Sequence, residues 1–485
     1  MALGRPEDYL KRVSSRRVEL YVAGERVENP LEHPVTRPVI ETISKVYELT
    51  LREEYRGILT AKGLSGDEVS RFLHVERSAD DLVKRVESQR IVNAYVGNCN
   101  YRCTGHDGIN ALYAATYEVD EKLGTDYHKR FTEYLKYLQA NDLVVATAMT
   151  DVKGDRSKRP GEQRGRPLTY VHIVEERRDG IIVKGAKMHI SGAALADEIL
   201  VVPTRAMGPD EREYAVAFAV TPDTKGLYFV SSWNPFDSFK RVSRDLGVDA
   251  DYPSPYGHRN TYLIIFDEVF VPRERVFLAG EYEYASKIVE YFIAHHRAAG
   301  AGCKAGFVDV ILGAAALAAD ANGVLSARYI QEKLAEIKFH GEAAYAPGLA
   351  AAIRGWRHPS GAFIPDYTLA NVAKLEAVNH LKEAIVSAAE IGGGIVVNAP
   401  SLRDLKIDGV GDKVAEALKA NEAYTAEERL RAMRLLQLWT SGPHLVGLIQ
   451  GGGPPATQWV ALRRTVKNEL PKLIEGAKRL AGIGG

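Results

Sequence analysis

The chain has 485 residues, of which 46% are hydrophobic and 26% charged, so it falls among folded soluble proteins and outside the range of disordered ones. Lysine plus arginine equals aspartate plus glutamate at 63 each, which excludes a global field that would attract nucleic acid or an anionic membrane. The first twenty residues lack an apolar core, and three cysteines are too few for a disulfide framework, so we expect a cytoplasmic protein.

The first part of the chain is predicted to be helical. Apolar residues recur at intervals of three and four in the segments 36–55, 79–98 and 125–142. We therefore expect an N-terminal helical domain over residues 1–145.

Short β-rich runs separated by turn residues follow. These runs span 170–192, 198–204, 214–222 and 261–272. They predict a middle β domain over residues 146–278, folded as a small β-barrel, with a sandwich as the alternative.

Helical periodicity returns in the last part of the chain, where Gly and Pro clusters separate the segments 284–320, 327–345, 369–391 and 425–442. These segments predict a C-terminal four-helix bundle over residues 279–485. The most apolar stretch, 308–323, is shorter than the roughly 18 apolar residues that a membrane span needs. Helices, then sheet, then helices make the fold class α+β and multidomain.

The cysteines and one histidine form two pairs with helical spacing. Cys99 and Cys103 are four residues apart, and His296 precedes Cys303 by seven, so on helices each pair would share a face. Three thiolates and an imidazole suit either a tetrahedral zinc ion or an iron–sulfur cluster. The alternative is that the cysteines are small buried hydrophobes and His296 is a hydrogen-bonded core residue.

Two glycine-containing segments are candidate ligand loops. The segment 146–156 combines Thr, Asp and Lys with a glycine, and the segment 185–192 adds Ser191, so together they could hold a flavin edge or a phosphate. The segment 441–455 places three consecutive glycines after a helix, near His444 and Gln450. Each segment could equally be an ordinary turn, with Ser191 facing solvent.

The whole chain resembles the family of flavin-dependent 4-hydroxyphenylacetate 3-hydroxylases, and within it the 4-hydroxybutyryl-CoA dehydratases. The resemblance is carried by Cys99, Cys103, 33-HPVTRPVIETIS, 148-AMTDVKGDR, 178-RDGIIVKGAKMHISG, 264-IIFDEVFVP, 296-HRAAGAGCKAG, 314-AAALAADANG, 425-TAEERLRAMRLL and 450-QGGGPP. It implies an acyl-CoA dehydrogenase-like fold, a homotetramer with FAD at a subunit interface, and an acyl-CoA substrate, with no nucleic acid or membrane partner.

The resemblance also implies roles for individual residues. Cys99, Cys103, His296 and Cys303 would ligate a [4Fe-4S] cluster, which favours iron–sulfur over zinc. The implied flavin contacts are Met149, Thr150, Asp151, Lys153 and Ser191. The implied substrate contacts are Arg90, Tyr101 and Gln450, and the implied catalytic residues are His296 and Lys304.

The reaction that the resemblance implies is the dehydration of 4-hydroxybutyryl-CoA to crotonyl-CoA, with vinylacetyl-CoA isomerase activity. The leaving β-hydrogen is not acidic, so ordinary acid–base catalysis is insufficient. The implied radical route removes the α-proton and passes one electron to FAD, which acidifies the β-position. The cluster would act as a Lewis acid, and His296 could leave iron to serve as a base.

The sequence departs from the dehydratase pattern at positions associated with proton transfer. Thr261 and Gly447 stand where those enzymes carry glutamate, Gly300 replaces a tyrosine, and Gln450 replaces a histidine. Candidate replacements, each with a structural role as the alternative, are Tyr101, His106, His189 and His444.

These departures keep other functions open. The chain could be a divergent paralogue that acts on another acyl-CoA. Other readings of the same residues are a flavin-dependent aromatic monooxygenase without a working cluster, and a non-catalytic homologue that only binds cofactor or a partner.

Overall fold

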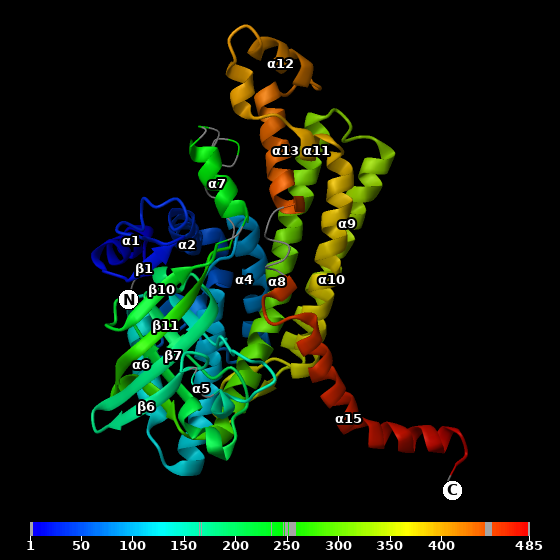
Figure 1. The fold of residues 1–485 in the computed structure, drawn as a ribbon. Coiled ribbons are helices and arrows are strands. Elements are labelled where there is room, and N and C mark those ends of the chain that lie inside the picture. The colour runs from blue at the N-terminus through cyan, green and yellow to red at the C-terminus, as the bar shows by residue number, and fades with distance from the viewer. Residues whose placement is uncertain are drawn as a thin grey trace.

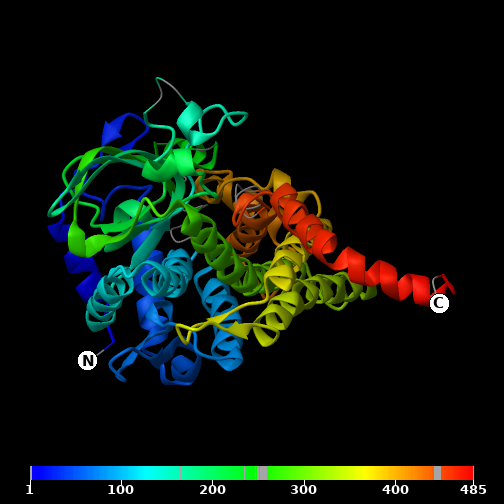
Figure 2. The same ribbon diagram turned by 90° about the horizontal axis from the view of Figure 1, so that it is seen from below.

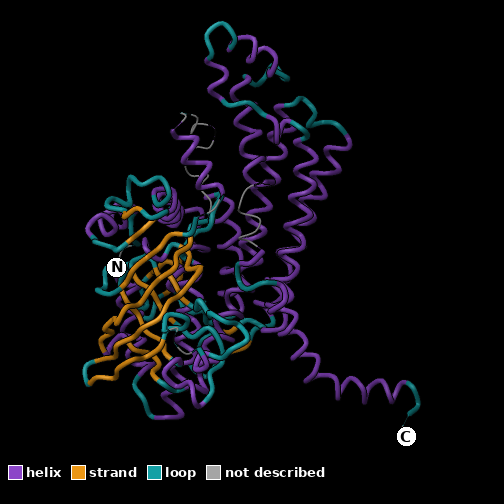
Figure 3. Tube along the Cα trace, viewed as in Figure 1, coloured by secondary structure: helices purple, strands orange, loops and turns teal. Residues whose placement is uncertain are grey.

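The computed structural model describes residues 3–483 except 164, 166, 234, 246, 248–250, 252–258 and 442–448. One part of the molecule combines the N-terminal helices with the sheets, and a column of long helices stands beside it (Figures 1 and 2). The strands gather in the first part, as Figure 3 shows, and the column is helical. The fold is therefore mixed and multidomain, as expected.

The N-terminal part is mainly helical and agrees with the periodicity of the sequence. Helices occupy the three expected segments, together with a short β3–β4 hairpin (Thr60–Lys62, Glu68–Ser70). The helices are α1 (Pro6–Ser15), α2 (Arg37–Thr50), α3 (Arg56–Leu59), α4 (Ala79–Val96), α5 (Cys103–Leu123) and α6 (Tyr127–Ala140).

The strands of the middle part form two sheets. The larger sheet has the order β2-β1-β10-β11-β7-β6, and its strands are β1 (Leu20–Val22), β2 (Glu25–Arg26), β6 (His172–Arg177), β7 (Gly180–Ser191), β10 (Leu227–Ser231) and β11 (Thr261–Pro272). The smaller has the order β12-β9-β8-β5, with strands β5 (Val145–Ala148), β8 (Glu198–Val201), β9 (Val216–Val220) and β12 (Val276–Ala279). Helix α7 (Pro235–Asp245) follows β10.

The predicted closed β-barrel is wrong for the described part of the chain. Neither sheet joins its edge strands, and the two sheets face each other instead, with the rings of Phe218 on β9 and Phe266 on β11 5.9 Å apart. Strands β5, β8 and β9 are buried along their whole length, because helices α5 and α6 also contact the smaller sheet. A sheet covered on both faces is a middle layer and not a barrel wall.

Long helices make up the C-terminal part. They are α8 (Tyr282–Ala321), α9 (Arg328–Ile353), α10 (Tyr367–Gly392), α11 (Ile395–Asn398), α12 (Gly411–Leu418), α13 (Ala426–Ser441) and α15 (Pro455–Leu480), with a small β13–β14 hairpin (Trp356–Arg357, Phe363–Ile364). Helices α8, α9 and α10 pack against one another, and α13 packs on α8 and α10. Helix α15 contacts α10 and then leaves the body (Figure 1).

Helix α8 is the one described helix that is long and apolar enough to cross a membrane by length and composition. Its apolar window is 61% buried within the protein, and α8 contacts α4, α5, α9, α10 and α13. Its apolar surface is therefore covered by its own neighbours, as in the central helix of a folded core.

Candidate active site

Cys99 and Cys103 meet where α4 gives way to α5. The expectation that one helix carries both is wrong, because α4 ends at Val96 and α5 begins at Cys103 itself. Gly97 ends α4 in the left-handed conformation at φ 58°, so Cys99 lies beyond the end of that helix.

The connection nevertheless brings the two thiols together. Tyr101, at φ 58°, turns the chain, and Asn100 Oδ1 accepts the backbone N–H groups of Arg102 and Cys103 at 3.0 Å each. A hydrogen bond with Cys103 lowers the pKa of the Cys99 thiol to about 6. Cys99 is therefore the thiol of this pair that ionises readily.

His296 and Cys303 lie on α8, so the prediction that they share a helix is confirmed. Cys303 Sγ accepts a hydrogen bond of 3.2 Å from Asn93 Nδ2 on α4, the helix that leads to Cys99. Burial raises the pKa of Cys303, and the charge of nearby Cys99 raises it further. All three thiols thus lie between α4, α5 and α8.

Asp107 on α5 orients the imidazole of His296. Its Oδ2 lies 2.7 Å from His296 Nδ1, and its Oδ1 accepts a hydrogen bond of 3.2 Å from Arg85. Burial alone would raise the pKa of Asp107, but Arg85 and His296 outweigh burial and lower it to about 2. The ionised carboxylate holds a proton on Nδ1 and leaves Nε2 with its lone pair, which is how a histidine that ligates a metal is usually supported.

These four side chains do not form a preformed site for a single metal ion. Two thiolates on one tetrahedral zinc lie about 3.8 Å apart. Among the described residues, three or more ligand atoms of His, Cys, Asp and Glu all lie within 4.8 Å of one another only in the set His74, Glu76 and Asp81. No three of the ligand atoms of the cysteines and His296 are therefore gathered as tightly as in that set.

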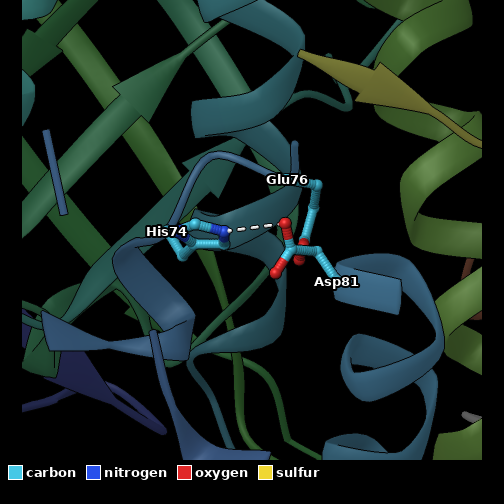
Figure 4. Close-up of side chains that lie close together, drawn as sticks. All are labelled: His74, Glu76 and Asp81. Carbon is cyan, nitrogen blue, oxygen red and sulfur yellow. Dashed lines mark ion pairs between the residues drawn. The ribbon is translucent and has the colours of Figure 1, made fainter. Parts of the chain in front are cut away.

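That other set belongs to a largely buried network of charged side chains (Figure 4). His74 Nε2 lies 3.4 Å from Asp81 Oδ2, and Arg71 Nη1 lies 3.6 Å from Asp81 and 3.9 Å from Glu76. Glu76 also lies 2.8 Å from Nε2 of the fully buried His106. The guanidinium already supplies the positive charge that a metal ion would bring, so this group is structural, and His106 belongs to it.

Arg259, which the sequence analysis did not single out, connects the cysteines to Ser191. Its Nε donates to Ser191 Oγ at 2.9 Å. Burial would lower the pKa of Arg259, but the nearby Cys99, Cys103 and Cys303 raise it. The residue follows an undescribed segment and belongs to no repeating pattern, so only the fold reveals its place.

The two predicted flavin segments lie side by side. Met188 N donates to Thr150 O at 2.8 Å, and Lys187 Nζ lies 2.9 Å from Asp151 Oδ1. Lys187 Nζ also donates to the Met149 carbonyl at 2.9 Å. Asp151 is thus occupied by a buried ion pair and fixes the backbone of the segment, while Lys187 is a residue that the sequence analysis missed.

Two residues in these segments have an unusual backbone conformation. Lys153 has φ 74° and His189 has φ 68°, both in the left-handed region that few residues other than glycine adopt. Lys153 N donates to Thr169 O at 2.8 Å, and burial lowers the pKa of its amine. Such strained positions concentrate at functional sites, so they mark this edge as a candidate ligand surface.

The glycine loop before α15 rests on His296. Lys374 Nζ donates to the Ile449 carbonyl at 3.0 Å, and Arg297 Nε donates to the Gly452 carbonyl at 3.2 Å. A Cβ at Gly452 would lie 3.3 Å from His296 Cδ2 and 3.4 Å from Lys374 Cε. Gly452 also has φ 81°, a backbone conformation in which a side chain would be strained, so glycine fits this position best. Gln450 is exposed on the same loop, and His444 and Gly447 lie outside the described residues.

Two buried lysines, Lys304 and Lys374, lie at the same place. Lys304 is 5% exposed, and a Cβ at Gly300 would lie 3.4 Å from its Nζ. Burial, followed by Lys304 and Arg297, lowers the pKa of Lys374 to about 6. Lys374 is therefore an uncharged amine at neutral pH, which no pattern in the sequence indicated.

Tyr101, Thr261 and Arg90 differ in their relation to the cysteines. The Tyr101 hydroxyl accepts the Asn260 backbone N–H at 3.2 Å, and its pKa is raised first by burial and then by Cys99. Thr261 lies opposite Ser191 at the start of β11. Arg90 is held by Asp309 at 2.7 Å and Glu342 at 2.8 Å. Its role as a substrate contact stays a prediction.

Comparison with known proteins supplies the context for this geometry. Residues 5–278 and 285–482 match the profiles described as 4-hydroxyphenylacetate 3-hydroxylase N terminal and C terminal. The chain is 38% identical to the 4-hydroxybutyryl-CoA dehydratase/vinylacetyl-CoA-Delta-isomerase of Clostridium aminobutyricum, over 97% of this chain and 99% of that protein. It is 28% identical to the oxygenase component of 4-hydroxyphenylacetate 3-monooxygenase from Thermus thermophilus, over 88% and 86% of the two chains.

Solved structures agree with these matches. An archaeal 4-hydroxybutyryl-CoA dehydratase from N. maritimus, described as oxygen tolerant, superimposes with a TM-score of 0.94 at 36% identity, covering 100% of this chain and 96% of that one. The oxygenase component of 4-hydroxyphenylacetate 3-monooxygenase complexed with FAD superimposes with a TM-score of 0.83 at 25% identity, covering 99% of each chain.

Proposed function

Since the chain belongs to the 4-hydroxyphenylacetate 3-hydroxylase family and is an enzyme similar to 4-hydroxybutyryl-CoA dehydratase, we propose that it dehydrates 4-hydroxybutyryl-CoA to crotonyl-CoA. Isomerisation of vinylacetyl-CoA would use the same site. The observation that carries the proposal is the convergence of Cys99, Cys103, Cys303 and His296, with His296 oriented by Asp107.

We propose that this set holds a [4Fe-4S] cluster. The three thiols and the Nε2 of His296 are ligands of the types that iron–sulfur clusters accept. FAD would lie along the segments 149–153 and 187–191, where Arg259 links Ser191 to the thiols. When bound, FAD would exchange single electrons with the substrate, and the cluster would act as a Lewis acid on its oxygen.

The protein's own residues would then bind and orient the thioester and handle protons. Arg259 and Lys304 place positive charge beside the thiols, which favours negative charge on the substrate once its α-proton is removed. Asp107 holds the His296 proton on Nδ1, so Nε2 is the atom that would ligate iron or, when free, accept a proton. The glycine loop at 450–453 covers this side of the imidazole.

Lys374 is our candidate for part of the lost proton-transfer chemistry. The dehydratase pattern has acidic or phenolic groups where this chain has Thr261, Gly300 and Gly447. An uncharged Lys374 amine beside the glycine loop is able to accept a proton at neutral pH. A different acyl-CoA as the preferred substrate remains compatible with this replacement.

We propose that the active enzyme is a homotetramer that works in the cytoplasm. Helix α15 supports an oligomer, because it leaves the body and exposes Trp459 at 62%, Val460 at 60% and Leu473 at 59%. Apolar side chains on an extended helix are usually buried by another subunit. The same proposal includes domain limits at 145 and 278 and an acyl-CoA dehydrogenase-like relationship. It also includes a C-terminal four-helix bundle formed by α8, α9, α10 and α13.

Anaerobic purification followed by turnover assays tests the function. A brown protein with about four irons and one FAD per chain that forms crotonyl-CoA from 4-hydroxybutyryl-CoA is the expected result. A Cys303→Ser variant, purified in parallel, should lose iron and turnover together. A yellow, iron-free wild-type protein that hydroxylates a phenol would favour the monooxygenase alternative, and loaded protein inactive on either CoA ester would favour another substrate.

A further inference from the structure

Two histidines face each other between α9 and α10, on helices that carry none of the proposed cluster ligands. His340 Nδ1 on α9 lies 2.9 Å from His380 Nδ1 on α10. The two helices pack side by side (Figure 1). The His340 residue is 9% exposed, and the His380 side chain is 20% exposed. The proposed dehydration uses neither histidine.

The outer nitrogen of each ring faces a carboxylate one helical turn earlier. His380 Nε2 lies 3.4 Å from Glu376 Oε2, and His340 Nε2 lies 3.9 Å from Glu336 Oε1. A carboxylate on Nε2 favours the tautomer with its proton there and leaves the lone pair on Nδ1. The two inner lone pairs would then repel each other unless a cation or a shared proton lies between them.

The separation of the inner nitrogens matches that of two ligands on one ion. At a metal–nitrogen distance of about 2.0–2.1 Å, two imidazoles lie about 2.9 Å apart at a right angle and about 3.4 Å apart in a tetrahedron. The observed 2.9 Å needs little or no movement of the helices.

The local charge also favours a cation. Glu336 and Glu376 lie beside the two rings, and burial and then His380 lower the pKa of His340 while Glu336 and Glu383 oppose that shift. Lys333, which pairs with Glu336 at 3.0 Å, supplies one compensating charge.

We propose that His340 and His380 bind one first-row divalent metal ion, such as Zn²⁺, through their Nδ1 atoms. Imidazole and carboxylate ligands suit ions of this class. The bound ion would join α9 to α10 and stabilise the helical column next to α8, which carries His296 and Cys303.

Equilibrium dialysis of the cofactor-loaded full chain against ZnCl2 tests the site. Wild-type protein should bind about one more zinc per chain than the His340→Asn/His380→Asn double variant, because zinc at other sites cancels in the comparison. His172→Asn, on strand β6, is the matched histidine control and should bind as wild type. Glu376→Gln should weaken the binding about tenfold or more.

Equal zinc binding by the double variant and the wild type would overturn the proposal and leave a pair that only shares a proton. A second measurement needs no variant: zinc should slow backbone hydrogen exchange of α9 and α10 in the wild type. Exchange in these helices that zinc leaves unchanged would also overturn it.

Discussion

Replacing Asp107 with asparagine removes the charge that orients His296 and keeps nearly the same shape. The carboxylate lies 2.7 Å from His296 Nδ1 and is fully buried. An asparagine can present its NH2 group to Nδ1, which would move the ring proton to Nε2 and block that atom as a ligand. We therefore expect Asp107→Asn to weaken iron binding by 10- to 100-fold, about the loss typical when the support of a metal ligand is removed.

The same substitution should also destabilise the fold. The pKa of Asp107 is lowered from 3.8 to about 2, which corresponds to about 2 kcal/mol of stabilisation at neutral pH. The substitution also leaves Arg85, which is 2% exposed, without its carboxylate partner. We therefore expect the free energy of unfolding to fall by about 3 kcal/mol in total. Because the folded pKa is depressed, this stabilisation is present above about pH 4 and disappears as the pH falls towards 2. The difference between wild type and variant should shrink over that window.

Iron release to a chelator and urea unfolding measure the two effects separately. Glu198→Gln is the matched control, because it breaks the 2.6 Å ion pair between Arg275 and the buried Glu198 on β8. This variant should lose similar stability but release iron at the wild-type rate. If Asp107→Asn also released iron at the wild-type rate, His296 would not be a ligand supported by Asp107.

Three further predictions use the thiols and the buried amine. Cys303→Ser should retain less than half of the wild-type iron after anaerobic reconstitution, because a hydroxyl is a poor replacement for a thiolate, and full iron content would contradict its role as a ligand. In cofactor-free protein, alkylation of Cys99 by iodoacetamide should have its midpoint near pH 6, where the hydrogen bond with Cys103 places its pKa, and Arg259→Gln should raise that midpoint. Lys374→Met should remove the rise in turnover between about pH 5 and 7, since the wild-type amine, with a pKa of about 6, loses its proton there; an unchanged pH profile would exclude Lys374 as a base.

Much of the fold could be predicted from sequence periodicity. Apolar spacing located α2, α4, α6 and the long C-terminal helices, and it placed His296 and Cys303 on one helix because α8 has no break between them. The prediction of a β-barrel was wrong, although the sequence contained a pattern that argues against a barrel. Segments such as Val216–Val220 are apolar at every position, which is typical of strands covered on both faces and not of an alternating barrel wall.

The first cysteine pair shows where spacing becomes misleading. An interval of four between Cys99 and Cys103 predicts that both lie on one face of a helix. In the structure, Gly97 ends α4 before Cys99, and a new helix, α5, begins after the turn at Tyr101. Gly97 follows the last apolar residue of its helix, so it was a visible stop signal. The thiols still meet, because hydrogen bonds from Asn100 close the turn in place of the helix.

The residues that sequence reasoning missed all act through contacts between distant segments. Asp107 lies one turn after Cys103 on α5, so a carboxylate on a buried face was its only local signal. Arg259 and Lys374 carry no local signal, because each is brought to the thiols by a different part of the fold. From the sequence alone, either side chain could equally have been exposed to solvent.

Arg259, together with the predicted Lys304, explains why the site would favour negative charge on a substrate. In the cofactor-free protein, the thiolate of Cys99 offsets only part of the charge of Arg259 and Lys304, and burial, followed by Lys304 and Arg297, lowers the pKa of Lys374 so that it adds no charge at neutral pH. A thioester that has lost its α-proton is an anion, and a buried site with such a surplus would stabilise it more than the neutral substrate. The positive charges would therefore act on the step that removes the α-proton, before any hydroxyl leaves.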